Sequence, residues 1–300
     1  MTEKFYKVAG HMFSLSMPEN QAEWRLLDNY RPFEVTVSAD TDNRTLFRCA
    51  LSQELPSGNM ELFYHDEPDD DGMARIDIFR LENGFIFEMR PFRNSPSAYR
   101  LWTSRDFSEG RIMDWKENGT GRFPIDNSLM LMFALNTMPL KTLEMHASVT
   151  VRNGKGYLFL GKSGTGKSTH SRMWLENIPG CRLLNDDNPI VRVLEDGTVM
   201  VYGSPWSGKT RCYVNAEYPA GGFVQIMQYP SNIISRQNTL DSYISVYTSC
   251  SGLKMDEAMN DLLHSTIENV IEKVPCWLMK CLPDGNAARV CCTTVTHEES

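Results

Sequence analysis

One nine-residue segment constrains this chain more than any other: Gly161-Lys162-Ser163-Gly164-Thr165-Gly166-Lys167-Ser168-Thr169. It has the spacing of a P-loop, in which a glycine, four residues and Gly-Lys-Ser follow one another. The glycines let the backbone turn so that successive N–H groups point at one phosphate chain. Lys167 then supplies a cation to the β- and γ-phosphates, and the Ser168 hydroxyl supplies a ligand to Mg²⁺. The segment therefore predicts a site for ATP and Mg²⁺.

The residues on either side fit such a loop. Residues 156–160 are a short apolar run that predicts a strand leading into it, and residues 168–177 predict a helix after it. A helix that begins near Lys167 points its positive end at the same phosphates. The alternative is a glycine-rich turn with a surface lysine, which this order of strand, loop and helix disfavours.

The composition narrows the class of protein. The 300 residues are 41% hydrophobic and 23% charged, which allows one large or two ordinary globular domains. A net charge of −8 without a long Lys/Arg run argues against nucleic acid and a membrane surface as partners. No signal peptide is visible, and the apolar stretch 129–140 is too short to span a bilayer. The scattered cysteines, without a CxxC pair, are typical of a reduced cytoplasmic protein.

We predict two domains of mixed α/β (α+β) class. Residues 1–125 form a β-rich domain, with a hairpin over 75–89 around the turn Asn83-Gly84. They carry no phosphate-binding pattern, so a lid, an oligomer contact and substrate recognition all stay open as their role. Residues 126–300 form the nucleotide-binding domain, which opens with a helix capped at 126–128.

His146 is the first candidate outside the loop. Residues 145–151 and 156–160 predict a hairpin around Asn153-Gly154, so the strand before the loop has an antiparallel neighbour. His146 begins that neighbour, opposite the strand residue that meets the loop. Hairpin geometry would bring it near the phosphates, and a hydrogen-bonded structural histidine is the alternative that the sequence leaves open.

Asp186 and Asp187 follow a strand predicted over 181–185. Carboxylates at the end of a strand can hold Mg²⁺ and take a proton from an attacking hydroxyl. The alternative is a solvated turn, since Asp-Asp-Asn-Pro also starts turns well. Two carboxylates soon after the loop helix favour the phosphate site. The hairpin predicted next, over 189–202, indicates a largely antiparallel sheet.

Ser207-Gly208-Lys209-Thr210 repeats the end of a P-loop but lacks the first glycine, so it is not a second P-loop. Lys209 would present its charge to a phosphate or to the acceptor. The alternative is a tight surface loop with Trp206 packed beneath it.

Four features follow one another along the chain: His146, the loop, Asp186-Asp187 and Ser204-Pro205-Trp206-Ser207-Gly208-Lys209. In this order they resemble the C-terminal kinase domain of HPr kinase/phosphorylase. They resemble more closely the HPr-kinase-related proteins, which share the core of that domain. This core is similar to the nucleotide domain of phosphoenolpyruvate carboxykinases. The resemblance covers 126–300 and implies a P-loop core with a mixed, largely antiparallel sheet. It implies that Lys167 and Ser168 contact nucleotide and Mg²⁺. It also implies that Asp186 and Asp187 are metal ligand and general base, in an order left open, and that His146 lies near the transferred phosphate.

The sequence thus predicts an ATP- and Mg²⁺-dependent kinase that phosphorylates a hydroxyl, on Ser or Thr of a protein or peptide. The alternatives are a non-catalytic nucleotide-binding sensor or scaffold and a carboxykinase-like enzyme for a small organic acid. Because the glycine-rich signature that follows the core of HPr kinases is not found here, the acceptor stays open, a small molecule included. The reverse phosphorylase reaction, the preferred base and the oligomeric state, a homo-oligomer included, are also open.

Overall fold

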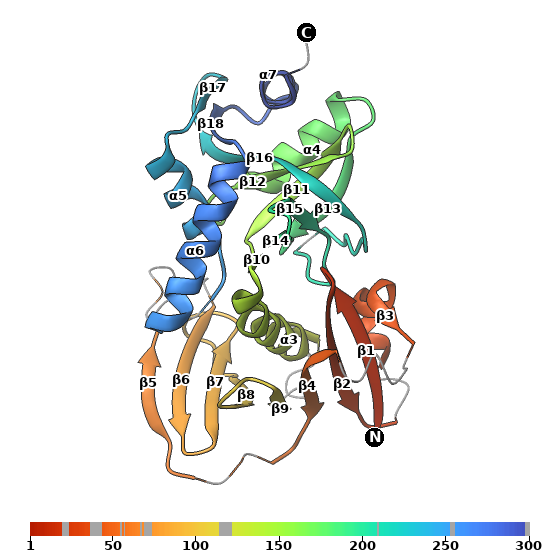
Figure 1. Cartoon of the computed structure of the whole chain (residues 1–300), viewed down its shortest axis with the longest axis vertical. Coiled ribbons are helices and arrows are strands. Elements are labelled where there is room, and N and C mark those ends of the chain that lie inside the picture. The colour runs from red at the N-terminus through yellow and green to blue at the C-terminus, as the bar shows by residue number, and fades with distance from the viewer. Residues whose placement is uncertain are drawn as a thin grey trace. The chain divides into compact units, whose positions relative to one another are not determined.

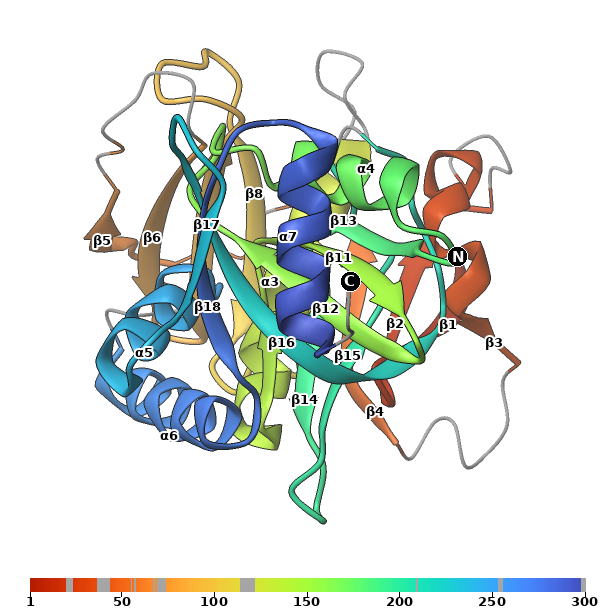
Figure 2. The same cartoon turned by 90° about the horizontal axis from the view of Figure 1, so that it is seen from above.

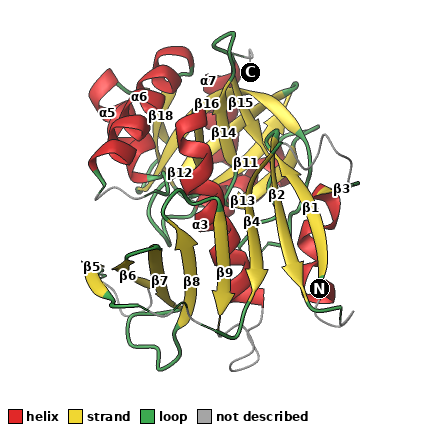
Figure 3. Cartoon of the chain, turned by 60° about the horizontal axis from the view of Figure 1, so that its bottom comes forward, coloured by secondary structure: helices red, strands yellow, loops and turns green. Residues whose placement is uncertain are grey.

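The computed structural model describes residues 1–19, 24–36, 44–54, 56, 58–66, 68, 74–113, 122–208, 210–252 and 256–297. The chain divides into two compact units, Met1–Asn136 and Thr137–Ser300, whereas the sequence predicted a boundary at 125. Each unit is built on a nine-stranded sheet (Figures 1 and 3). The mixed α/β class is therefore confirmed. No helix in the described part of the chain has the length and apolar character needed to cross a membrane.

The first unit is β-rich, as predicted, and its sheet has the order β3-β1-β2-β4-β9-β8-β7-β6-β5. Its strands are β1 (Thr2–Val8), β2 (His11–Met17), β3 (Glu34–Val35), β4 (Thr45–Leu51), β5 (Glu61–His65), β6 (Arg75–Leu81), β7 (Gly84–Arg90), β8 (Tyr99–Ser104) and β9 (Glu109–Met113), with a short 3-10 helix η1 (Arg25–Phe33). The hairpin predicted at Asn83-Gly84 is present, and Leu81 pairs with Gly84 across it.

Helix α3 (Arg122–Thr137) begins earlier than the predicted cap at 126–128. Pro124 fits the first turn because that turn needs no intrahelical N–H donor. Arg122 Nε then donates to Asp126 Oδ2 at 2.7 Å, so Asp126 lies inside the helix and pairs along it. Further along, the Phe133 ring packs edge-on against the Phe13 ring, with centroids 6.2 Å apart, which buries this face of α3 on the first sheet.

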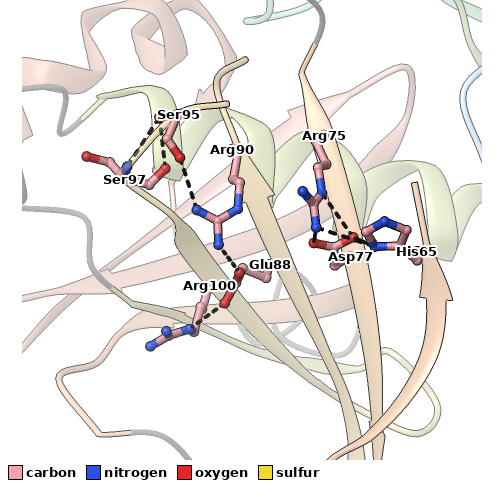
Figure 4. A network of polar contacts seen from close by, with 8 residues as sticks. All are labelled: His65, Arg75, Asp77, Glu88, Arg90, Ser95, Ser97 and Arg100. Carbon is pink, nitrogen blue, oxygen red and sulfur yellow. Dashed lines mark hydrogen bonds and ion pairs between the residues drawn. The ribbon is translucent and has the colours of Figure 1, made fainter. Parts of the chain in front are cut away.

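Two carboxylates lie opposite each other on this sheet, Asp77 on β6 and Glu88 on β7 (Figure 4). Like charges in directly opposed positions repel. Four cationic or ionisable side chains lie 2.6 to 3.2 Å from these carboxylates: His65, Arg75, Arg90 and Arg100. The network is neutralised within the sheet, and we assign it a stabilising role.

The second sheet has the order β10-β14-β15-β16-β12-β11-β13, with β18 also paired to β16 and β17 paired to β18. Its strands are β10 (Thr142–Glu144), β11 (Ala147–Arg152), β12 (Lys155–Leu160), β13 (Arg182–Asp187), β14 (Ile190–Val193), β15 (Val199–Tyr202), β16 (Glu217–Gln228), β17 (Ile233–Arg236) and β18 (Cys276–Cys281). The pairs β12–β16 and β16–β18 are parallel. The pairs β11–β12, β11–β13, β14–β15 and β15–β16 are antiparallel, so this sheet is mixed.

Helices cover both faces of this second sheet. They are α4 (Lys167–Asn177), α5 (Thr239–Thr248), α6 (Glu257–Lys273) and α7 (Gly285–Thr296), with a short 3-10 helix η3 (Met138–Leu140). Figure 2 shows α4 and α7 side by side over the sheet. Tyr157 and Phe159 of β12 share a buried cluster with residues of α4 and α7, whereas Leu158 and Leu160 share one with residues of α5 and α6. Both faces of β12 are thus buried, which is why the strand is apolar at successive positions.

Candidate functional site

The glycine-rich loop connects β12 to α4, the strand and helix that the sequence predicted around it. Gly161, Gly164 and Gly166 have φ angles of +146°, +79° and +105°. Residues with a Cβ rarely adopt such angles. A Cβ on Gly161 would also lie 2.5 Å from Thr165 Oγ1. The conformation of the loop therefore depends on glycine at these positions.

The Lys167 side chain contacts the backbone of the loop. Its side chain is buried, and Nζ donates to the carbonyl oxygen of Gly161 at 2.8 Å, with the Lys162 carbonyl 3.4 Å away. Burial lowers the pKa of the ammonium, while the charges of Asp187 and Asp186 raise it. The lysine therefore lies within electrostatic range of both carboxylates, where it can also meet an anionic ligand of the loop.

The remaining predicted contacts lie in the loop and in the first turn of α4. Ser163 and Ser168 are exposed and Thr169 is half-buried. The first N–H groups of a helix have no intrahelical acceptor, and the helix dipole favours an anion beside them. The Ser171 hydroxyl lies 2.6 Å from the Ser148 hydroxyl, a hydrogen bond that joins α4 to β11. The turn is therefore held against the sheet with its polar end at the loop.

Asp186 and Asp187 are the last two residues of β13 and do not follow it, which corrects the predicted end of this strand. The strand is longer because Asp186 pairs with Ser148 and Asp187 with Ala147 of β11. Asp186 is 4% exposed, and its Oδ1 atom has no hydrogen-bond partner among the described residues. Burying such an oxygen costs free energy unless a partner interacts with it, and a bound cation would be such a partner.

Asp187 differs from its neighbour in both exposure and backbone. Its side chain is 39% exposed, and its φ of +140° is rare for a residue with a Cβ. His146 Nε2 lies 3.2 Å from Asp187 Oδ1, and the His146 N–H donates to the Ser249 carbonyl at 2.7 Å. The histidine is thus anchored by its backbone, with its ring against the exposed carboxylate.

A cavity of about 470 Å³ opens beside this pair. His146 lines it together with Gly161 and Lys162 from the first half of the loop. Arg236 at the end of β17 and Asp241 in the first turn of α5 also line it. The cavity is in the size range of small-ligand sites, and its wall carries both a cation and a carboxylate.

Residues 203–208 pack against the end of β13. The Asn185 side chain donates to Ser204 Oγ at 3.1 Å and to the Trp206 carbonyl at 3.0 Å. Trp206 itself is 2% exposed, which is the packing expected of a tight loop over a buried indole. These bonds tie the loop to the strand that carries the two aspartates.

Gly208 brings this loop into contact with the candidate site. Its N–H donates to the Asp186 carbonyl at 2.8 Å. A Cβ on Gly208 would lie 3.1 Å from Asp187 Oδ2, so the close approach depends on glycine. The neighbouring Lys209, predicted as a catalytic cation, lies outside the described residues.

Sequence reasoning missed Glu144, a 2% exposed residue at the end of β10. Burial raises the pKa of its carboxyl to about 8; a hydrogen bond from Ser251 lowers it, and the charge of Asp187 raises it further. The Ser251 N–H also donates to the Glu144 carbonyl at 2.9 Å. An acidic residue within the apolar run Leu143-Glu144-Met145 was the signal that could have revealed it.

The described residues contain no cluster of three His, Cys, Asp or Glu side chains that could hold a metal ion by themselves. Mg²⁺ is commonly bound by one or two carboxylates together with water and substrate phosphates. Asp186 fits that type of site, because its buried Oδ1 has no partner within the described part of the chain. Asp187 and Ser168 are the other two ligands that the sequence predicts.

No model of a protein family matches the chain, and neither does any curated protein. The structure of the Hpr(Ser) kinase/phosphatase from Coxiella burnetii is similar to it with a TM-score of 0.31 and 14% identity. That match covers 51% of this chain and 94% of the other. A likeness of this size establishes neither fold nor activity.

Proposed function

We propose that this chain is an ATP- and Mg²⁺-dependent phosphotransferase that acts on a hydroxyl, on Ser or Thr of a protein or peptide or on a small molecule. The observation that carries the proposal is the convergence of Lys167 with two unlike carboxylates. Both Asp186 and Asp187 act on the Lys167 ammonium, and Asp187 contacts His146. Phosphoryl transfer requires such a set: a cation and amides for the phosphates, a metal ligand, and a base for the nucleophile.

The environments of the two aspartates suggest different roles. Asp186 is buried, and one of its oxygens has no partner among the residues that the structure describes, so we assign it, with Ser168, to Mg²⁺. That ion, when bound, would neutralise charge on the phosphates. The Asp187 side chain is 39% exposed beside His146, so we assign it to the acceptor. It takes the hydroxyl proton as the acceptor oxygen attacks the γ-phosphorus, while the bond from that phosphorus to the β-phosphate oxygen breaks and ADP leaves. His146 orients that carboxylate. Lys167 and the loop amides stabilise charge on the γ-phosphoryl oxygens.

The cavity beside His146 supports an acceptor that enters at the first half of the loop. It is bordered by Gly161 and Lys162 and therefore adjoins the end of the loop that holds the γ-phosphate in this proposal. Its Arg236 would also suit a small acid, which is the observation that favours a carboxykinase-like reaction as the second candidate.

A turnover measurement separates the kinase from a nucleotide sensor. We would compare ADP formation and ATP affinity in the wild type, Asp187→Asn and the control Asp196→Asn, which changes a carboxylate at an exposed hairpin turn. A kinase retains ATP binding in Asp187→Asn but loses turnover, with the control unchanged. Equal turnover in Asp187→Asn and wild type would contradict the assigned role.

A further inference from the structure

A second cavity, of about 560 Å³, adjoins the other half of the loop. One wall consists of Gly164, Thr165 and Gly166 with the first turn of α4, including Thr169. The opposite wall is formed by the turns that follow β16 and β18. The two cavities therefore border different halves of the loop. Gly161 and Lys162 line the first cavity, and residues 164–166 line the second.

The opposite wall of the second cavity is largely apolar, with Gln228 as its polar side chain. It carries Tyr229, Pro230, Leu282 and Pro283. Tyr229 is 42% exposed and Leu282 is 40% exposed, so large apolar surfaces face solvent beside a polar loop. None of the described residues that line this cavity is Asp, Glu, Lys or Arg. Such a wall suits an uncharged, flat aromatic group better than it suits a phosphate.

Hydrogen bonds hold this wall in place. The Tyr229 N–H donates to the Cys281 carbonyl at 3.0 Å, which joins the two turns. The Gln228 side chain donates to the Gly164 carbonyl at 3.3 Å, which joins the wall to the loop. These two hydrogen bonds therefore fix the position of the apolar surface relative to the loop.

The direction of a bound triphosphate follows from the proposed site. Asp187 and His146 act at the γ-phosphate, and His146 shares its cavity with Gly161 and Lys162. The γ-end therefore lies at the first half of the loop. The α-phosphate lies toward the other half and Thr169, and the group attached to it points into the second cavity.

We infer that the second cavity holds the nucleoside of the phosphoryl donor, with its base packed against Tyr229 and Leu282. This inference rests on the proposed function of the loop. Stacking on an aromatic side chain contributes substantially to base binding and tolerates different bases, because every base has a π-face.

The test compares Mg²⁺-ATP with inorganic tripolyphosphate, which has the phosphates but no nucleoside. Calorimetry would give both affinities for the wild type, Tyr229→Ala, Leu282→Ala and the control Leu240→Ala, whose leucine is 68% exposed on α5. We expect Tyr229→Ala to weaken ATP binding by about tenfold or more, with tripolyphosphate binding unchanged. Leu282→Ala should weaken ATP binding alone, and Leu240→Ala should change neither affinity.

Two results would overturn the inference while leaving the proposed function intact. One is equal affinity of the wild type for ATP and tripolyphosphate. The other is a Tyr229→Ala variant that retains its unfolding midpoint and binds ATP as the wild type does. Failure of the wild type to bind either compound would instead refute the proposed function of the loop, and the inference with it.

Discussion

His146 Nε2 lies 3.2 Å from Asp187 Oδ1, and the register of the sheet explains this contact. His146 directly precedes β11, and Asp187 ends β13. The two strands pair antiparallel, with Ala147 opposite Asp187. Because strand pairing holds Asp187 and the residue after His146, the separation of the two side chains does not depend on a long loop. Sites built on strands in this way are more precise than sites on loops.

Asp186→Asn should raise the Mg²⁺ concentration needed for half-maximal turnover. The substitution keeps the size of the side chain but removes the charge of a buried carboxylate, whose Oδ1 bonds to none of the described residues. We expect an increase of about 10- to 100-fold, the usual cost of disturbing a metal site. A Mg²⁺ titration of ADP formation measures it, with Asp196→Asn as control. An unchanged Mg²⁺ requirement would show that Asp186 is not a ligand of the metal ion.

Lys167→Ala should abolish ATP turnover with the fold intact. The lysine donates to the loop carbonyls of Gly161 and Lys162, and its removal leaves the phosphates without their buried cation. A loss of about 100-fold or more in kcat/KM is expected. Lys155→Ala is the matched control, because Lys155 is exposed at the start of β12. Circular dichroism checks the fold, and full turnover in Lys167→Ala would be incompatible with the account.

Gly208→Ala should lower kcat without changing ATP affinity. The added Cβ would lie 3.1 Å from Asp187 Oδ2 and would displace that carboxylate from His146. A small displacement of a reacting group costs about 10- to 100-fold in rate. Gly58→Ala is a suitable control, since a Cβ there meets its nearest neighbour at 3.7 Å. If kcat stays at the wild-type value, Asp187 is not the base.

Glu144 should make the stability of the second unit depend on pH. Burial raises the pKa of its carboxyl from 4.5 to about 8, so the folded chain binds a proton that the unfolded chain releases. This contribution is fully present below pH 4.5 and is lost as the pH rises to 8 and above. The loss is on the order of a few kcal/mol.

Thermal unfolding from pH 5 to pH 9 tests this prediction. Glu144→Gln keeps a neutral side chain at every pH, so its unfolding temperature should exceed that of the wild type increasingly toward pH 9. Ser251→Ala removes the hydroxyl that lies 3.4 Å from Glu144 Oε1 and should not abolish the pH dependence. Parallel curves for wild type and Glu144→Gln would show that this carboxyl does not titrate as described.

Local patterns predicted several elements correctly. The Asn83-Gly84 turn between alternating runs gave the β6–β7 hairpin, and the turn at Asn153-Gly154 gave the β11–β12 hairpin. Both signals are short-range, since a turn and its flanking strands are contiguous. The same reasoning placed His146 opposite the start of the loop, and the register agrees, because Ser148 pairs with Phe159, two residues before Gly161.

Longer-range features could not be predicted. β16 includes Pro219 and two glycines, residues that disfavour a strand in the local sequence. Its pairing with β15, where Met200 lies opposite Pro219, extends it to Glu217. The contact of Gly208 with Asp187 and the burial of Glu144 likewise arise from packing between distant segments. Tertiary contacts of this kind override local propensity.

In the proposed function, the loop and the aspartate pair together turn over Mg²⁺-ATP. ATP binding and ADP formation in the wild type, measured beside the double variant Asp186→Asn/Asp187→Asn, test this directly. We expect both proteins to bind ATP and only the wild type to form ADP, with water as acceptor if no other is present. Equal ADP formation by the two proteins, or no ATP binding by either, would contradict it.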